Sequence, residues 1–272
     1  LYARVVHPLA VQGPGGETRG AFYRHWRKVA LDGTELAVPD SPANRAYFGL
    51  AHNQFQASAY PLVRVVALVE SGTRVLFAAV LGPHQKVGEA TLARDLLPRL
   101  GPGMLCLADR LFFGYQLWQQ VQRRGAELLW RIKLNHQLPQ QAVLPDGSWL
   151  SAIYRTDHDR QHQRHGIVVR VIDYRIGAEP ARLLTSILDP AAAPAEELLQ
   201  QFPERWPVET AFGEFKTQLR GGAEVVLRSQ TPELVKQELY GFLLAHYVIR
   251  SVIHEAAFDA ERRDRGTHEA KQ

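Results

Sequence analysis

A segment late in the chain carries one carboxylate between two cations. It reads Phe202-Pro-Glu-Arg205-Trp206-Pro-Val-Glu209-Thr-Ala-Phe-Gly-Glu-Phe-Lys216. At about 100° per residue, four of these residues fall within an arc of roughly 60° of a helix, beside an apolar stripe: Phe202, Arg205, Glu209 and Lys216. Such a face can be a solvated surface with ordinary ion pairs, or it can be part of a site in which Glu209 acts with other acidic residues. The spacing leaves both interpretations open.

Two aspartates directly follow apolar runs. Asp32 follows Val29–Leu31, and Asp109 follows Met104–Ala108. We interpret both runs as strands, and we expect the first strand to stop in a turn at Asp32-Gly33-Thr34. Open α/β folds place their sites at the carboxyl ends of sheet strands. Asp32 is therefore either a turn residue or part of a site that it shares with Asp109.

Taken together, Asp32, Asp109 and Glu209 offer a set of oxygen ligands. Carboxylate oxygens suit Mg²⁺ or Mn²⁺, which bind through one or two carboxylates plus substrate phosphate. Two such ions roughly 4 Å apart stabilise the attacking and leaving oxygens of an in-line phosphoryl displacement. Because the chain has 28 acidic residues, spacing alone leaves this a hypothesis.

The elements expected around these residues alternate between strands and helices, which predicts a mixed α/β sheet with helices on its faces. We interpret 39–60 as a long surface loop. We predict strands at Leu62–Glu70, Arg74–Leu81, Met104–Ala108 and Glu127–Lys133, and helices at Leu1–Leu9, Glu89–Leu100 and Tyr115–Arg124.

The pattern changes after residue 134. Helical periodicity disappears over 135–180, where short alternating runs are separated by turn residues, so we predict a β-rich insertion. Its tip carries His158, His162 and His165, which we interpret as a solvated basic loop rather than a metal site. A strand at 182–188, a helical region from Ala195 and a long helix at Pro232–Ala257 follow. Proline is tolerated in the first turn of a helix, so the helix that carries Glu209 should begin near residue 207.

Composition limits the classes of protein that the chain can belong to. The 272 residues can bury a substantial core, and their net charge of +4 is compatible with nucleic acid without requiring it. No run approaches the roughly 18 apolar residues of a membrane span. The single cysteine, Cys106, excludes an internal disulfide and fits a reducing compartment. A phosphatase of the haloacid-dehalogenase type is disfavoured because Ala30 stands at the place of its nucleophilic aspartate.

The sequence resembles the DDE transposases of bacterial insertion sequences, specifically the insertion-sequence-four family, over nearly its whole length. The family signature Tyr-x2-Arg-x3-Glu-x6-Lys is matched at residues 202, 205, 209 and 216, with phenylalanine at the first position. Further matches are Leu31-Asp32-Gly33-Thr34, Pro39-Asp40-Ser41-Pro42-Ala43-Asn44, Leu107-Ala108-Asp109-Arg110 and Thr231-Pro232-Glu233-Leu234. The N-terminal DNA-binding region of these transposases is expected to be missing before Leu1.

The resemblance implies an RNase H-like fold with a β-rich insertion between the second aspartate and the glutamate. Residues 1–134 would form the first part of the catalytic domain, 135–180 the insertion, and 181–272 the remainder. Asp32, Asp109 and Glu209 would bind two Mg²⁺ or Mn²⁺ ions. Of the neighbouring residues, Arg110, Arg205 and Lys216 are expected to contact DNA phosphate. Trp206 would stack on an unpaired base or serve as a core residue.

The activity implied is metal-dependent cleavage and strand transfer at the ends of an insertion sequence, as in cut-and-paste transposition. The partners would be double-stranded DNA and a second subunit, because two DNA ends call for two subunits, and the location would be the bacterial cytoplasm, at the nucleoid. Leu111 stands where the family usually has glycine, next to Asp109-Arg110. This departure motivates the alternative of a catalytically inactive, transposase-derived DNA-binding fragment.

Overall fold

The computed structural model describes residues 1–14, 16–52, 57–203, 206–219 and 226–269. Its strands are β1 (Gln12–Gly13), β2 (Gly16–Glu17), β3 (Phe22–Tyr23), β4 (Trp26–Ala37), β5 (Leu50–His52), β6 (Ala57–Glu70), β7 (Leu76–Pro83), β8 (Met104–Ala108), β9 (Glu127–Ile132), β10 (Ala142–Val143), β11 (Trp149–Ile153), β12 (Ile167–Ile176) and β13 (Glu179–Thr185). Its helices are α1 (Tyr2–Val5), α2 (Pro42–Phe48), α3 (Glu89–Ala93), the 3₁₀ helix η1 (Arg94–Arg99), α4 (Tyr115–Arg123), α5 (Asp157–Gln161), α6 (Ala195–Gln201), α7 (Trp206–Glu214), the π-helix η3 (Phe215–Leu219) and α8 (Pro232–Glu269).

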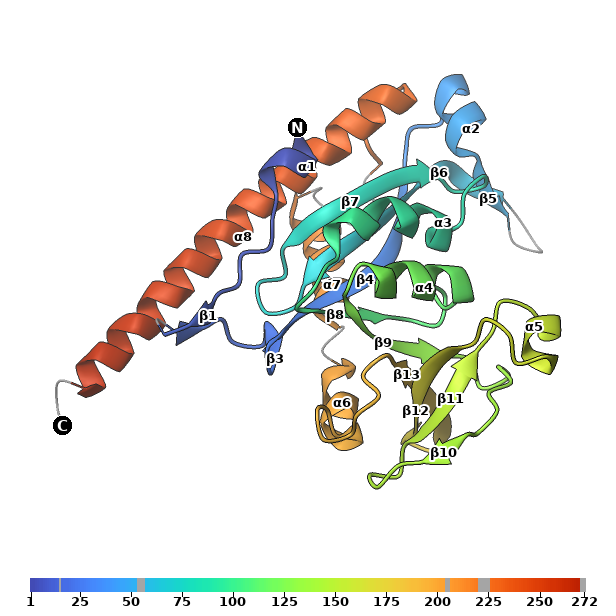
Figure 1. The fold of residues 1–272 in the computed structure, drawn as a ribbon. Coiled ribbons are helices and arrows are strands. Elements are labelled where there is room, and N and C mark those ends of the chain that lie inside the picture. The colour runs from blue at the N-terminus through green and yellow to red at the C-terminus, as the bar shows by residue number, and fades with distance from the viewer. Residues whose placement is uncertain (15, 53–56, 204–205, 220–225, 270–272) are drawn as a thin grey trace.

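One large mixed sheet organises the described part of the chain (Figure 1). Its strand order is β10-β11-β12-β13-β9-β8-β4-β6-β5, and β7 and β3 pair with β6 and β4. The three strands β4, β8 and β9 are parallel to one another, whereas β4 pairs with β6, and β9 with β13, in antiparallel fashion. The expected mixed α/β sheet is thus confirmed.

Helices cover both faces of this sheet. In Figure 1, α3 and α4 lie in front of the central strands and α7 lies behind them. The front helices contact β6, β7 and β9, and α7 contacts β4 and β6. The long helix α8 crosses behind β7 and also contacts η3. The arrangement is the RNase H-like architecture that the sequence predicts.

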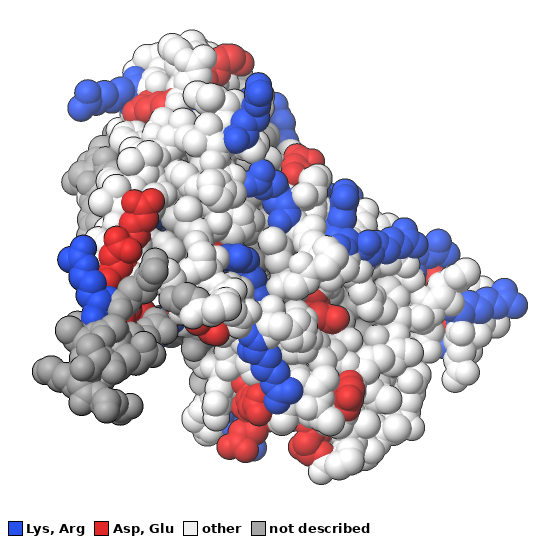
Figure 2. All heavy atoms as spheres, turned by 60° about the vertical axis from the view of Figure 1, so that its left-hand side comes forward, with Lys and Arg blue, Asp and Glu red and all other residues white. Residues whose placement is uncertain are grey.

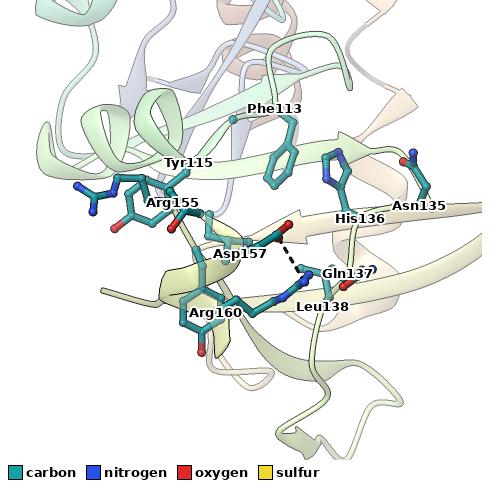
Figure 3. Close-up of a pocket in the computed structure, with 13 residues that line it drawn as sticks. Phe113, Tyr115, Asn135, His136, Gln137, Leu138, Arg155, Asp157 and Arg160 are labelled. Atoms are coloured by element: carbon teal, nitrogen blue, oxygen red, sulfur yellow. Dashed lines mark ion pairs between the residues drawn. The ribbon is translucent and has the colours of Figure 1, made fainter. Parts of the chain in front are cut away.

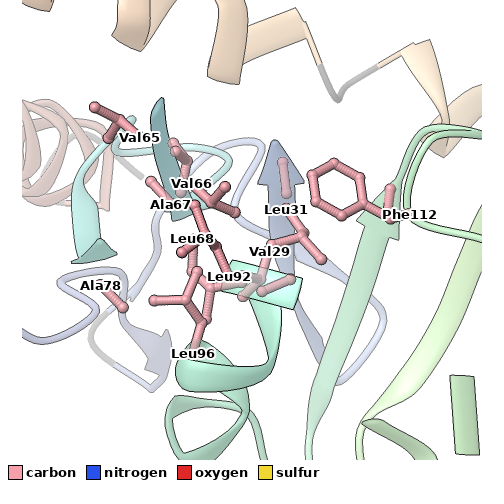
Figure 4. Close-up of a cluster of buried hydrophobic side chains, with 14 of the residues drawn as sticks. Val29, Leu31, Val65, Val66, Ala67, Leu68, Ala78, Leu92, Leu96 and Phe112 are labelled. Carbon is pink, nitrogen blue, oxygen red and sulfur yellow. The ribbon is translucent and has the colours of Figure 1, made fainter. Parts of the chain in front are cut away.

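The main core fills the space between the sheet and the front helices (Figure 4) and continues to buried residues of α7, η3 and α8. Leu68 of β6 and Val29 of β4 are fully buried there, against Leu92 of α3 and Leu96 of η1. On the opposite face, Leu105 and Leu107 of β8 belong to a second apolar cluster with Leu198 of α6. Both faces of β8 are therefore covered, which explains why its sequence is apolar throughout.

Strand β4 does not end at Asp32, which corrects the expected turn. The ladder between β4 and β6 runs without interruption from Val29↔Glu70 to Ala37↔Leu62 and includes Asp32↔Ala67. The backbone groups of Gly33 and Thr34 therefore have strand partners in β6, and the Asp-Gly pair does not turn the chain. The local signal for a turn was outweighed by pairing with a strand some 35 residues away.

Other expectations differ from the structure in their details. The segment 39–60 is not a plain loop, because Ser41 caps α2 by accepting a hydrogen bond from the backbone N–H of Asn44 at 3.1 Å. The expected helix Glu89–Leu100 changes from α to 3₁₀ geometry at residue 94, ahead of Pro98. The helix expected at 1–9 is only the short α1, the strand expected at 182–188 is β13, and α8 extends twelve residues beyond Ala257, to Glu269.

The segment 135–180 is rich in strands, as expected, and it extends the same sheet through β13. Arg170 of β12 anchors it from a fully buried position. Its guanidinium donates to the Ser148 hydroxyl at 2.7 Å, to the carbonyl of Ala193 at 2.7 Å, and to the Asp146 carboxylate. A buried arginine with this many acceptors fixes the β10–β11 connection and the segment between β13 and α6.

Charged side chains of both signs are mixed on the surface. Figure 2 shows basic and acidic side chains interspersed on the face that it presents, with uncharged surface between them. This pattern agrees with the modest net charge of +4. Among the residues that the structure describes, there is no helix with the length and apolarity needed to cross a membrane.

Candidate active site at the sheet edge

The parallel register of β4 and β8 brings Asp32 and Asp109 to the same level of the sheet. Leu31 of β4 is the register partner of Ala108, the last residue of β8. Asp32 and Asp109 are the next residues on these two chains, and neighbouring strands lie about 4.8 Å apart. The structure thus brings together two of the three carboxylates that the sequence singled out.

The two aspartates also share a face of the sheet. Side chains alternate along a strand, so Asp109 lies on the same side as Leu107, and Asp32 on the same side as Ala30. Ala30 and Leu107 are register partners, and Leu107 packs in the cluster that contains α6. Both carboxylates therefore face the side of the sheet that α6 and α7 cover.

Each aspartate is held by the backbone next to it. The Asp32 Oδ1 accepts a hydrogen bond from the N–H of Gly33 at 2.8 Å, and the Asp109 Oδ1 accepts one from the N–H of Arg110 at 2.7 Å. Both side chains are half-buried, while Arg110 is exposed. Such bonds to the following N–H orient a carboxylate without neutralising it.

Helix α7 carries the third carboxylate. It begins at Trp206 with Pro207 as its second residue, which confirms the expected start, and Glu209 lies exposed in its first turn. The expected apolar stripe is buried at Ala211, Phe212 and Phe215. Because α7 packs on β4 and β6, the helix lies over the sheet face that carries the two aspartates.

The remaining residues of the signature segment are described by the structure to different extents. Lys216 is half-buried in the π-helix that continues α7, where the wider turn rotates it from its place on an ideal α-helix. Arg205 lies outside the described residues. Trp206 is described as the first residue of α7, but its side chain is not. The expected roles of these residues thus remain predictions.

The last residue of α7 is tied to the rest of the fold by charge. Glu214 accepts hydrogen bonds from Arg250 of α8 and, at 3.4 Å, from Arg74 of the β6–β7 connection. Its other oxygen lies 3.6 Å from Nε2 of His246, whose pKa burial lowers to about 4. Glu214 is therefore an anchor that joins three elements and fixes the far end of the helix that carries Glu209.

A fourth carboxylate lies close to Asp32. Glu89, the first residue of α3, is brought next to Gly33, where an added Cβ would lie 2.7 Å from its Oε1. Burial raises the pKa of Glu89, Arg64 opposes that rise, and the charges of Asp32 and Glu35 add to it. Sequence analysis missed Glu89 because its approach depends on how α3 folds back over β4.

Two further residues continue the same edge of the sheet. Arg131 of β9 follows Trp130, the register partner of Ala108, so it lies at the level of Asp109. Tyr174 of β12 is half-buried, and its hydroxyl is buried. Burial raises the pKa of Tyr174, with Arg131 lowering it and Asp109 raising it. The strand that contains Arg131 was predicted, but its parallel register with β8 was not, and this register is what places Arg131 level with Asp109.

A pocket of about 570 Å³ opens beside the loop that follows Asp109 (Figure 3). Phe113 and His136 meet edge to face there with ring centroids 4.7 Å apart, and burial lowers the pKa of His136. Across the pocket, Arg160 pairs with Asp157 at 3.2 Å. Aromatic, amide and guanidinium groups therefore line a hollow between the central sheet and the β-rich segment; its lining includes Phe113, Tyr115, Asn135, His136, Gln137, Arg155 and Arg160.

The described ranges contain no group of three or more His, Cys, Asp and Glu side chains placed to hold a metal ion. Asp32, Asp109 and Glu209 lie in these ranges, so the structure does not bring the three predicted carboxylates together as one such group. The three histidines at the tip of the β-rich segment form no such group either, although the rings of His158 and His162 lie 4.2 Å apart. The aspartate pair is the arrangement that fits a hard cation best, because it offers oxygen donors from adjacent strands at one level.

Comparison with known proteins identifies the class. A family model described as the transposase DDE domain matches residues 27–248, which is most of the chain. The open mixed sheet, with aspartates on two adjacent parallel strands, agrees with this match. The chain belongs to the transposase DDE domain family, and its relatives are transposases of the insertion-sequence-four type.

Two curated relatives come from Escherichia coli strain K12. The chain is 28% identical to the transposase InsG for insertion sequence element IS4, over 83% of this chain and 52% of that protein. It is 32% identical to the putative transposase InsZ, over 37% of this chain and 34% of that protein. The aligned region thus spans about half the length of the first relative and about a third of the second.

The fold also has a solved counterpart. A piggyBac transposase, determined as a synaptic complex with hairpin DNA, superposes with a TM-score of 0.55 at 11% identity. The match covers 85% of this chain and 48% of that chain. At this identity the similarity establishes the fold, and it agrees with the RNase H-like architecture.

Proposed function

We propose that this chain is the catalytic domain of a DNA transposase that cuts and joins strands at the ends of an insertion sequence. The observation that carries the proposal is the Leu31↔Ala108 register, which aligns Asp32 with Asp109 beneath the helix of Glu209. Membership of the transposase DDE domain family supports the same reaction. In this proposal the element is cut free of its donor DNA before strand transfer, as in cut-and-paste transposition.

The metal ligands in this proposal are Asp32, Asp109 and Glu209. Mg²⁺ or Mn²⁺ suits them, because these hard cations bind one or two carboxylates and complete their shells with water and phosphate oxygens. When bound, two such ions supply charge stabilisation to the attacking and leaving oxygens of the displacement. The residues of the chain orient the carboxylates through the backbone N–H groups of Gly33 and Arg110.

DNA would lie along the edge of the sheet at which Asp32 and Asp109 lie. Arg110 is exposed directly beside Asp109 and is suited to a phosphate of the cut strand. Lys216, Arg205 and Trp206 join it in the proposal, the first two as phosphate contacts and Trp206 as a stacking platform for an unpaired base. We further propose that two subunits act together, one for each end of the element.

The test is nicking of supercoiled DNA with Mg²⁺ or Mn²⁺ at one fixed salt concentration. Asp109→Ala should lower the nicking rate about a thousandfold, since several kcal/mol of charge stabilisation depend on the bound ion. The matched control is Asp95→Ala, which removes an exposed aspartate of η1 outside the site and should nick like wild type.

The opposite outcome would favour a different function. If wild type nicks no faster than Asp109→Ala while both bind duplex DNA equally, the chain is a DNA-binding fragment without catalysis. The exposed Leu111 beside the second aspartate is the residue that motivates this alternative. Binding measured by fluorescence anisotropy, at the same salt concentration, completes the comparison.

A further inference from the structure

The hydroxyl of Tyr174 is buried and has no hydrogen-bond partner within the described ranges of the chain. Buried hydroxyls are nearly always paired, since an unpaired one loses its bonds to water without replacement. By contrast, Tyr2 is also buried, but its hydroxyl donates to the carbonyl of Leu76 at 2.7 Å. The Tyr174 hydroxyl therefore makes no hydrogen bond that would explain its burial, whereas the Tyr2 hydroxyl does.

The position of Tyr174 points to the candidate active site. Its neighbour Ile172 pairs with Leu183 of β13, which in turn pairs with Arg131 of β9. Ile172 and Leu183 belong to the apolar cluster on the face where Asp109 lies, and Tyr174 packs against that cluster. Tyr174 is thus on the same face as the aspartates. It pairs with Ala181, so it lies two residues beyond the level of Arg131 and Asp109, just past the end of β9.

The chemistry around this hydroxyl favours an anionic acceptor. The fields of Arg131 and Asp109 both act on the phenol of Tyr174. The phenol is neutral at physiological pH, so it can donate a proton in a hydrogen bond. An anion that enters beside Arg131 would meet both a cation and an unused donor.

We propose that Tyr174 donates a hydrogen bond from its hydroxyl to a non-bridging phosphate oxygen of the DNA strand held beside Asp109. The inference rests on the proposed function, because it takes its ligand from the DNA that the site would cut. It makes Tyr174, a residue of the β-rich segment, a direct contact to the substrate. The segment then completes the site as well as extending the sheet.

The test compares Tyr174→Phe with Tyr2→Phe, since each change removes one oxygen and keeps the ring. Tyr174→Phe should melt at the same temperature as wild type or higher without DNA, because it deletes an unpaired polar atom. With a saturating duplex of an insertion-sequence end, its gain in melting temperature should be smaller than that of wild type. Its nicking rate should fall about ten- to a hundredfold, as for a lost hydrogen bond to a charged group.

Tyr2→Phe should show the opposite pattern, with a lower melting temperature and wild-type nicking per folded molecule. If Tyr174→Phe instead loses stability and keeps both the nicking rate and the DNA-dependent stabilisation, the hydroxyl has a structural role and the inference is overturned. Failure of the proposed function would appear separately, as wild type that nicks no faster than Asp109→Ala. The DNA-dependent stabilisation would still decide whether Tyr174 contacts phosphate.

Discussion

At the scale of single residues, the proposed site depends on Gly33 as well as on Asp32. Gly33 lies inside strand β4 and is not part of a turn, so glycine is needed here for its small size rather than for its backbone freedom. A side chain there would collide with Glu89, whose Oε1 and Cδ would lie 2.7 and 2.8 Å from the new Cβ. Glycine thus permits α3 to place an acidic group beside Asp32.

This contact predicts that Gly33→Ala and Glu89→Ala are not additive. Gly33→Ala alone should lower the free energy of unfolding by about 1 kcal/mol, because Glu89 must move. In the Glu89→Ala background the same change should be neutral or stabilising, since alanine is preferred to glycine in a strand by roughly 0.5–1 kcal/mol. Urea denaturation of the four proteins measures the coupling, and additive effects would contradict the contact.

At the scale of elements, the placement of α7 depends on its ends. The first turn carries Glu209, and the last residue, Glu214, is held by Arg250 and Arg74. The side chains of Glu214 and Arg250 are only 19% and 12% exposed, so their pairing is shielded from solvent. This anchor allows the first turn to stay exposed while the helix keeps its position over β4.

Glu214→Ala should therefore be strongly destabilising. Removing one partner of a largely buried pair leaves the other charge uncompensated, which typically costs about 3 kcal/mol. Thermal and urea unfolding measure the loss. The control is Asp40→Ala, whose pair with Arg45 lies on the surface and whose removal should leave the unfolding midpoint nearly unchanged. Equal effects of the two changes would contradict the anchoring role.

The β-rich segment has its own anchor, which predicts a dependence on pH. Burial of Asp146 is outweighed by hydrogen bonds from Ser148 and the N–H of Ala195 and by the charge of Arg170, so its pKa is lowered in the folded chain. A carboxyl with a lowered pKa adds stability above the ordinary aspartate value of about 3.9 and loses it as the pH falls through the folded value.

The free energy of unfolding of wild type should therefore fall more steeply below about pH 4 than that of Asp146→Asn. Above pH 5, the variant should be less stable than wild type by a nearly constant amount. Chemical denaturation between pH 2.5 and 7 tests both statements. Parallel curves for the two proteins over the acidic range would show that Asp146 adds no pH-dependent stability.

At the scale of the whole molecule, local patterns in the sequence predicted elements better than their pairing. The run Met104–Ala108 was predicted as a strand with the bounds that β8 has. Its apolar character is local and follows from burial on both faces. By contrast, β4 was expected to stop at Asp32, and this was wrong. The strand continues because it pairs with β6, which is distant in sequence and which no local pattern around Asp32 reveals.

For the candidate site too, the residues could be predicted from the sequence, but their arrangement in space could not. Asp32, Asp109 and Glu209 could be named from strand ends and from a family signature. Their relation depends on the parallel register of β4 and β8 and on the docking of α7, which no local pattern encodes. Tyr174 was invisible to sequence analysis, because its unpaired hydroxyl is a property of the folded sheet.

The central claim is that the sheet edge at Asp32 and Asp109 holds the ions that cut DNA. The most direct measurement is anomalous scattering from Mn²⁺ in crystals of the chain bound to a duplex of an insertion-sequence end. The account predicts manganese peaks roughly 2.2 Å from carboxylate oxygens of both Asp32 and Asp109, with a phosphate oxygen completing the shell. Well-ordered DNA at this edge with manganese bound only elsewhere would contradict it.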